Sequence, residues 1–207
     1  NVYQTNHDFA GRQGSASVGG RSGDWSWWLN GSHMNSQGQP MVFAWKAATS
    51  AGTATDVTGG VVVPGTENQA GRVLGTSTQY HTVQDHSKLK LAYDLTPTMR
   101  ASYTLGVWQN DSRGSADTYL STSTGAPLYY ASKVKVDDSY YSMTGTEFLG
   151  SQDNWEHLMH GLSLKTHTQG VWDWEVATSL YDFQQSISRA QATRVSNTSS
   201  NEAAYNL

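Results

Sequence analysis

The stretch from Ser87 to Asp111 alternates strictly between apolar and polar residues. Its apolar positions lie on both sides of Pro97: Leu89, Leu91 and Tyr93, then Met99, Ala101, Tyr103, Leu105 and Val107. Alternation over this length predicts β-strands, because successive side chains of a strand point to opposite faces. We therefore expect one hairpin here. A three-residue turn that pairs Asp94 with Thr98 would place both apolar runs on one face.

Two further hairpins of the same design are predicted at about residues 14–34 and 156–187. In the first, the turn signal Ser22-Gly23 would pair Arg21 with Asp24. In the other, Thr168-Gln169-Gly170 supplies the turn. Their apolar positions are Ala16, Val18, Trp25, Trp27 and Leu29, and then Leu158, Leu162, Leu164, Trp172, Trp174, Val176, Thr178 and Leu180. In all three hairpins, the apolar residues on the two sides of the short turn are expected to lie on the same face.

The connections between the hairpins are much longer than the turns within them. Long segments at about residues 35–81, 112–153 and 188–207 are expected to be loops, with short strands at 41–45, 60–63 and 128–136. Structureless loops beyond about 15 residues are uncommon in compact domains. An outer-membrane barrel combines short periplasmic turns with long extracellular loops. The pattern therefore favours one all-β domain over residues 1–207, an antiparallel transmembrane β-barrel of which about six or more strands are present.

Aromatic residues gather toward the ends of the predicted strands. Near the short turns lie Trp25, Trp27, Tyr93, Trp172 and Trp174, and toward the opposite ends lie Tyr103, Trp108 and Trp155. Such rings match the aromatic girdles of membrane barrels, although strands of a soluble sandwich are also enriched in aromatics. The apolar face would then contact lipid through Leu89, Leu91, Ala101, Leu105, Val107, Leu162, Leu164 and Val176. The other face would line a wet interior with Asn30, Lys90, Arg100, Ser102, Thr104, Asp173 and Glu175.

Composition changes this picture little. Charged residues make up 14% of the chain and the formal net charge is −4, so bulk charge suggests no nucleic-acid partner. Cys is absent, which excludes a disulfide framework and a thiolate metal site. No run of about 18 apolar residues is present, so no transmembrane helix is expected.

Candidate catalytic and metal-binding residues are few. His157 and His160 are three residues apart, which places them on opposite faces of a strand. Asp173 and Glu175 share a face at about 7 Å, a spacing compatible with an inverting glycosidase, but carboxylates are expected in a wet interior anyway. No phosphate-loop, dinucleotide or nucleophile-elbow motif is present. We therefore expect no enzyme activity, no catalytic residue, no metal and no cofactor.

Three segments resemble barrel hairpins of TonB-dependent outer-membrane receptors: GGRSGDWSWWLNGSHMNSQGQPMVFA, YDLTPTMRASYTLGVWQND and NWEHLMHGLSLKTHTQGVWDWEVATSLYDF. The resemblance covers most of residues 14–187. It implies a place in the bacterial outer membrane and active uptake of a scarce solute, often an iron–siderophore complex, with energy relayed by TonB. The family has a plug domain and a TonB box, which we do not find, and about 22 strands. The chain is therefore interpreted as an interior piece, with TonB, outer-membrane lipid and the rest of the same receptor as partners.

Four tyrosines of the second long segment are the candidate solute-binding residues: Tyr129, Tyr130, Tyr140 and Tyr141. Tyrosine offers a stacking face and a hydrogen-bonding tip, which suits an aromatic chelator. A structural role in strands above the membrane is the other interpretation. Residues 112–153 contain three basic and five acidic residues, so a strongly anionic ligand gains no support from this segment.

Two other functions stay open at this point. One is a complete small outer-membrane barrel or porin of about eight strands. The other is a secreted β-sandwich that binds carbohydrate through its Trp residues. The sandwich would hold Leu105, Trp172 and Trp174 between two stacked layers, whereas a barrel would turn them toward lipid.

Overall fold

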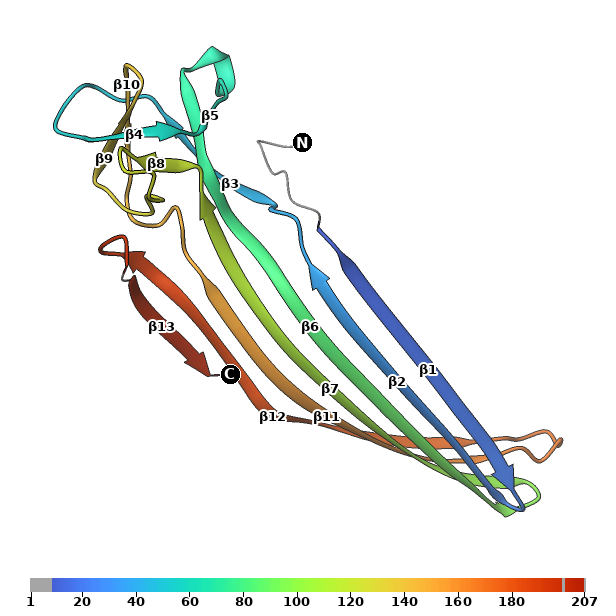
Figure 1. Cartoon of the computed structure of the whole chain (residues 1–207). Coiled ribbons are helices and arrows are strands. Elements are labelled where there is room, and N and C mark those ends of the chain that lie inside the picture. Colours follow the sequence, from blue (N-terminus) through green and yellow to red (C-terminus); the bar gives the residue numbers. More distant parts are fainter. Residues whose placement is uncertain (1–8, 199, 207) are drawn as a thin grey trace.

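The structure, a computed structural model, describes residues 9–198 and 200–206 and is all-β (Figure 1). Its larger sheet has a main path of seven strands in the order β1-β2-β6-β7-β11-β12-β13, with antiparallel neighbours throughout. These strands are β1 (Gly11–Ser22), β2 (Trp25–Gln37), β6 (Gly71–Thr96), β7 (Met99–Thr118), β11 (Ser151–Thr166), β12 (Glu175–Arg194) and β13 (Ser200–Asn206). The predicted all-β, antiparallel class is confirmed.

A smaller four-stranded sheet, in the order β10-β9-β4-β8, lies at the end of the long strands that is opposite the short turns (Figure 1). Its strands are β4 (Thr55–Gly59), β8 (Leu120–Thr122), β9 (Lys133–Val136) and β10 (Ser139–Ser142). Two short strands, β3 (Val42–Ala47) and β5 (Val61–Val62), pair with β6, and one short 3-10 turn, η1, spans Thr66–Asn68. Within the described residues, no helix is both long enough and apolar enough to cross a membrane.

The buried core lies around the smaller sheet. Its fully buried side chains include Leu74, Leu120, Val134 and Phe148, which come from four separate parts of the chain. By contrast, β1 is exposed along its whole length, and most side chains in the turn-side half of the long strands are exposed or half-buried. The molecule is therefore packed at one end, while the other end is a single sheet.

The β6–β7 hairpin has a tighter turn than the sequence predicted. Asp94 pairs with Arg100 rather than with Thr98, and Thr96 and Met99 flank a two-residue turn. An ion pair accounts for this register, because Arg100 Nε donates to Asp94 Oδ1 at 2.6 Å. The partner of Asp94 moves by two residues, so every side chain keeps its predicted face.

The β1–β2 hairpin shows the same kind of shift. Ser22 pairs with Trp25, so Gly23-Asp24 forms the turn and Arg21 lies opposite Ser26 rather than Asp24. Gly23 has a φ of +58°, a left-handed conformation that glycine adopts at little cost. The predicted turn was therefore one residue too early, because its first residue must supply this φ.

The β11–β12 turn is longer than predicted and spans residues 167–174. Leu164 pairs with Val176 and Lys165 with Glu175, after which the regular strand pairing ends. Trp172 and Trp174 consequently lie in the turn and not in a strand, contrary to the prediction. Asp173 accounts for the broad shape, since its carboxylate accepts a hydrogen bond from the backbone N–H of Thr168 at 2.6 Å.

The long strands extend far into segments that the sequence predicted to be loops. β6 begins at Gly71, β7 continues to Thr118, and β12 continues to Arg194 before β13 adds a further strand. Residues 71–76 of β6 are buried on both faces, so they show no apolar–polar alternation to mark them as strand. The larger sheet stays open within the described residues, with β1 and β13 at its two edges (Figure 1).

Candidate functional site: the two faces of the large sheet

Cross-strand pairing gathers mainly apolar residues from five strands on one face of the large sheet. From the turns outward, three rows are Trp25, Tyr93, Ala101, Leu164 and Val176; Trp27, Leu91, Tyr103, Leu162 and Thr178; and Leu29, Leu89, Leu105, His160 and Leu180. The next row contains Val107 and Leu158. Leu95 lines the same apolar groove at the turn end and adds a first row, and we call the whole set the apolar band. All eight residues predicted to face lipid belong to it.

The apolar band has a measurable height. Along β6 it covers eight steps, from Leu95 near the turn to Ser87, which pairs with Val107 of the last row; this is about 27 Å at about 3.4 Å per residue. A strand tilt of about 40° would reduce this to about 21 Å, close to the apolar height of about 25 Å in outer-membrane barrels. Beyond it, polar pairs begin: His33 Nδ1 lies 2.8 Å from Asp85 Oδ1, and Gln109 Nε2 donates to Glu156 Oε2 at 2.9 Å.

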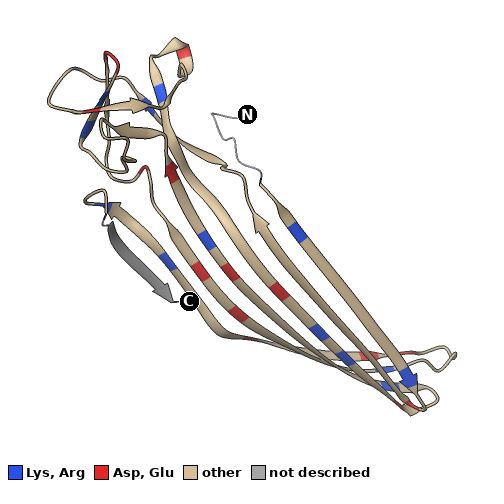
Figure 2. Ribbon diagram, in the orientation of Figure 1, with Lys and Arg blue, Asp and Glu red and all other residues tan. Residues whose placement is uncertain are grey.

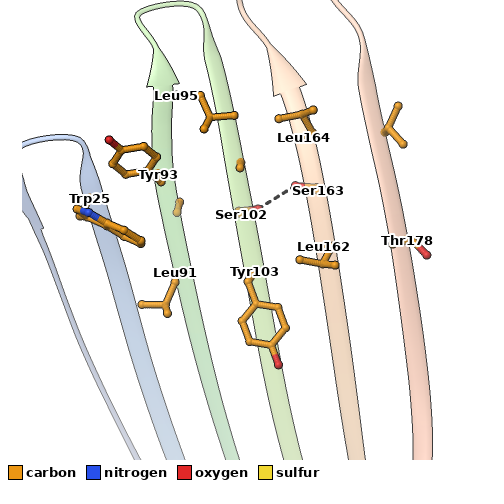
Figure 3. A pocket seen from close by; sticks show the side chains of 13 residues that line it. Trp25, Leu91, Tyr93, Leu95, Ser102, Tyr103, Leu162, Ser163, Leu164 and Thr178 are labelled. Atoms are coloured by element: carbon orange, nitrogen blue, oxygen red, sulfur yellow. Dashed lines mark hydrogen bonds between the residues drawn. The ribbon is translucent and has the colours of Figure 1, made fainter.

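No second layer covers the apolar band within the described part of the chain. Leu162 is 56% exposed and Leu180 is 63% exposed, although both are large aliphatic side chains. Figure 3 shows Trp25, Leu91, Tyr103 and Leu162 lying across neighbouring strands, where they line a shallow apolar groove. The arrangement predicted for a sandwich, with these rows between two stacked sheets, is therefore not present.

Aromatic rings mark the turn side of the band. The rings of Trp25 and Tyr93 pack with their centroids 4.7 Å apart, and Trp27 lies on the same face of β2. Trp172 and Trp174 are exposed in the turn between β11 and β12. These are the five residues predicted for the turn-side girdle, and all lie at or near that end of the sheet.

The girdle predicted for the opposite strand ends is wrong for two of its three residues. Trp108 and Trp155 lie on the polar face, because each is an odd number of residues away from the apolar positions of its own strand. Tyr103 does lie in the apolar band, but near its middle, where its hydroxyl is 2.7 Å from Nδ1 of His160.

The polar face is built mainly from small and charged side chains. Asn30 and Lys88 are paired on neighbouring strands, as are Lys90 and Thr104. Serine hydroxyls of β7 and β11, from Ser102 and Ser163, hydrogen-bond at 2.8 Å (Figure 3). Figure 2 shows charged residues distributed along the long strands and gathered again near the short turns. A hydrated environment suits this face.

Five rings interrupt the polar face where β7, β11 and β12 run side by side. We call them the ring cluster: Trp108, Trp155, His157, Tyr181 and Phe183. Centroid separations run from 4.6 Å for His157 with Phe183 to 5.9 Å for Trp108 with Trp155. His157, Tyr181 and Phe183 were not predicted as a group from the sequence, although alternation continued along β12 places Tyr181 and Phe183 on the polar face.

The four candidate tyrosines lie in or against the packed end of the molecule. Tyr141 is only 3% exposed and belongs to the core, with the guanidinium of Arg72 5.9 Å from its ring centre. Tyr129 packs edge-on against Phe148 and lies under the guanidinium of Arg194 at 4.7 Å. Burial raises the pKa of Tyr129. Tyr130 and Tyr140 are half-buried. Their predicted role in solute binding stays a prediction.

A buried carboxylate holds the loop before β11. Glu147 accepts hydrogen bonds from the backbone N–H and the hydroxyl of Thr144, both at 2.9 Å, and pairs with Lys46 of β3 at 2.5 Å. Burial opposes ionisation, but these hydrogen bonds outweigh it and lower the pKa of Glu147 to about 2. Its geometry is that of a structural anchor.

Comparisons of the chain with protein-family models, with curated proteins and with solved structures give no match. Within the described residues, no group of three or more His, Cys, Asp or Glu side chains is placed to hold a metal ion. The candidate functional feature of the chain is therefore the large sheet, with its apolar band on one face and its polar residues on the other.

Proposed function

We propose that the chain forms membrane-spanning strands of a bacterial outer-membrane receptor of the TonB-dependent type, which takes up a scarce solute such as an iron–siderophore complex. The observation that carries this proposal is the apolar band. It crosses five strands, has an estimated height of about 21 Å against about 25 Å for lipid-facing bands, and ends at a row of charged and polar pairs.

Exposure of the band to water would be costly. Burial of a Leu-sized or Val-sized side chain contributes about 1.5–3 kcal/mol, and Leu29, Leu162, Val176 and Leu180 are all close to half exposed or more. Contiguous apolar patches of this kind mark protein or membrane contact sites. Lipid acyl chains are the contact that best fits the apolar band, given the length of its strands, the aromatic rings at its turn side and the polar pairs at its other end.

The open edges of the sheet support a larger assembly. Among the described residues, β1 pairs with β2 alone, and β13 pairs with β12 alone. In lipid, every unpaired backbone N–H or C=O costs several kcal/mol, so a membrane sheet must close on itself. We propose that further strands of the same receptor pair with both edges, which accords with a wide barrel better than with a small one.

Cysteine labelling in the native membrane tests the orientation of the sheet. The chain contains no Cys, so each introduced thiol is unique within it. We expect Cys at Leu162 and Leu164 to resist a membrane-impermeant maleimide and to contact spin-labelled lipid. Cys at the intervening Ser163 should react with the maleimide and should show no contact with the spin-labelled lipid. Equal reactivity at all three positions would contradict the lipid-facing assignment.

Transport is tested separately by uptake of a radiolabelled ferric chelate into cells. We expect uptake to require both this protein and TonB, and to stop when the proton gradient is collapsed. Uptake that needs the protein but neither TonB nor the gradient would indicate a passive pore, and the receptor proposal would then be replaced by the porin alternative.

A further inference from the structure

The ring cluster lies at a defined height in the large sheet. His157 immediately precedes Leu158, which belongs to the last row of the apolar band. The two side chains point to opposite faces because they are neighbours in a strand. The ring cluster is therefore at the loop-side border of the apolar band, but on the polar face.

Two rings of the cluster are exposed where the proposed interior is wet. Phe183 is 60% exposed and Tyr181 is 51% exposed, yet both project from the polar face of β12. A structural role in packing the sheet would be served by buried rings. Exposed flat rings on a hydrated surface instead offer a stacking platform for another flat group.

His157 stands at the centre of the cluster and is only 9% exposed. Its Nδ1 lies 2.7 Å from the hydroxyl of Tyr181, which fixes the orientation of both rings. Its Nε2 and the Nε1 of Trp155 are buried without a hydrogen-bond partner among the described residues. Buried polar atoms normally find partners, so two unpartnered ring nitrogens in one cluster are an exception to that rule.

The β11–β12 pairing has a bulge at the same height. The register shifts between Glu156 and His157, so His157 pairs with Phe183 while Glu156 pairs with Gln185. Gln184 is left over as the extra residue. Bulges re-aim side chains and are over-represented beside functional sites. Here the bulge ends the regular alternation of β12 directly after Phe183.

On this face a lysine shares a cross-strand row with Tyr181, because Lys88, Gly106, Met159 and Tyr181 are paired in succession. Cross-strand pairing places His86 opposite Trp108, and Lys88 opposite Gly106 one row away. The nearest carboxylate on the same face of β11 is that of Asp153, two residues from Trp155 and four from His157, and its Oδ1 accepts a hydrogen bond from the Ser188 hydroxyl. Flat apolar faces that lie across Gly106 and Met159 from a lysine suit an aromatic group that carries negative charge.

We propose that the ring cluster is a stacking subsite for a negatively charged aromatic solute, with Phe183 and Tyr181 as the contact surface and Lys88 as the charge partner. This inference rests on the proposed function in one respect, namely that the polar face lines the path of the solute. His157 acts as a positioning residue, because its bond to the Tyr181 hydroxyl holds that ring in place.

Calorimetric titration of the detergent-solubilised protein with 2-naphthoate tests the subsite. Each ring removed, by Phe183→Ala or by Trp108→Ala, should weaken binding about 2- to 13-fold. Lys88→Gln should weaken it about 2- to 5-fold. The matched control is Leu180→Ala, which truncates a side chain of the same strand on the opposite face and should leave the affinity unchanged. Tyr181→Phe keeps the stacking ring but removes its bond to His157, so it should weaken binding measurably but by less than Phe183→Ala does.

Several outcomes would overturn the subsite. Absence of 2-naphthoate binding, or equal affinity of Phe183→Ala and the unaltered protein, would do so. Binding of neutral maltohexaose in place of 2-naphthoate would show that the solute is a saccharide. A Phe183→Cys thiol that resists a membrane-impermeant maleimide in the native protein would show that polypeptide covers the rings. None of these results alters the labelling pattern expected at Leu162, Ser163 and Leu164, so the subsite and the proposed function fail separately.

Discussion

Arginine placed in the middle of the apolar band provides the sharpest stability test. Leu162 belongs to the third of five rows counted from Leu95, so it lies near the midplane of the band. Arg at the midplane of a membrane barrel costs about 2–4 kcal/mol, and the cost falls to about 0–1 kcal/mol near the interfaces. We therefore expect Leu162→Arg to destabilise the protein by about 2–4 kcal/mol and Leu158→Arg, at the border row, by about 0–1 kcal/mol.

The assay is a reversible guanidinium titration in phospholipid vesicles, followed by Trp fluorescence. Ala177→Arg is the matched control, because Ala177 is exposed, lies on the polar face and pairs with Ser163 beside Leu162. It should change the free energy of unfolding by less than about 0.5 kcal/mol. If Leu162→Arg and Ala177→Arg cost the same, the band does not face lipid and the reasoning fails.

Three smaller predictions concern single contacts. The pKa of Glu147 is about 2 against an ordinary 4.5, so its ionised form stabilises the fold above pH 4.5 by about 3 kcal/mol and this is lost as the pH falls toward 2. Glu147→Gln should remove that dependence in acid unfolding followed by near-UV circular dichroism, and an unchanged acid transition would contradict it. Gly23→Ala forces a left-handed φ on alanine and should cost about 1 kcal/mol in the same guanidinium titration. Tyr181→Phe leaves Nδ1 of the buried His157 without its partner and should cost about 1–3 kcal/mol, with no loss if that hydrogen bond is absent.

The faces of the long strands could be predicted from the sequence because a period of two is insensitive to certain errors. Asp94 was expected opposite Thr98 and lies opposite Arg100, and Arg21 was expected opposite Asp24 and lies opposite Ser26. Each error moves the partner by two residues, which returns every side chain to the same face. The exact turns depend on an ion pair and on one glycine conformation, which alternation does not reveal.

The packed end could not be predicted in the same way. Residues 71–76 of β6 are covered on both faces, so no alternation distinguishes them from a loop. Tyr141 was read as a surface tyrosine of a loop, but β10 pairs with β9 and turns it into the core. Such placements follow from contacts between segments far apart in the chain, and a single sequence carries little signal for them.

In the proposed barrel, one β-sheet contacts lipid and solute at the same height, because neighbouring residues of a strand point to opposite faces. Leu158 belongs to the last apolar row, and His157 beside it belongs to the ring cluster. On β7, Val107 likewise belongs to the last apolar row, and Trp108 directly after it belongs to the ring cluster. Their apolar or aromatic character alone would assign Leu158, His157, Val107 and Trp108 to one surface. Their order along the strands assigns Leu158 and Val107 to one face and His157 and Trp108 to the other. It follows that Leu158 and Val107 variants should leave solute affinity unchanged, and that Trp108 variants should change solute affinity without altering the membrane contact.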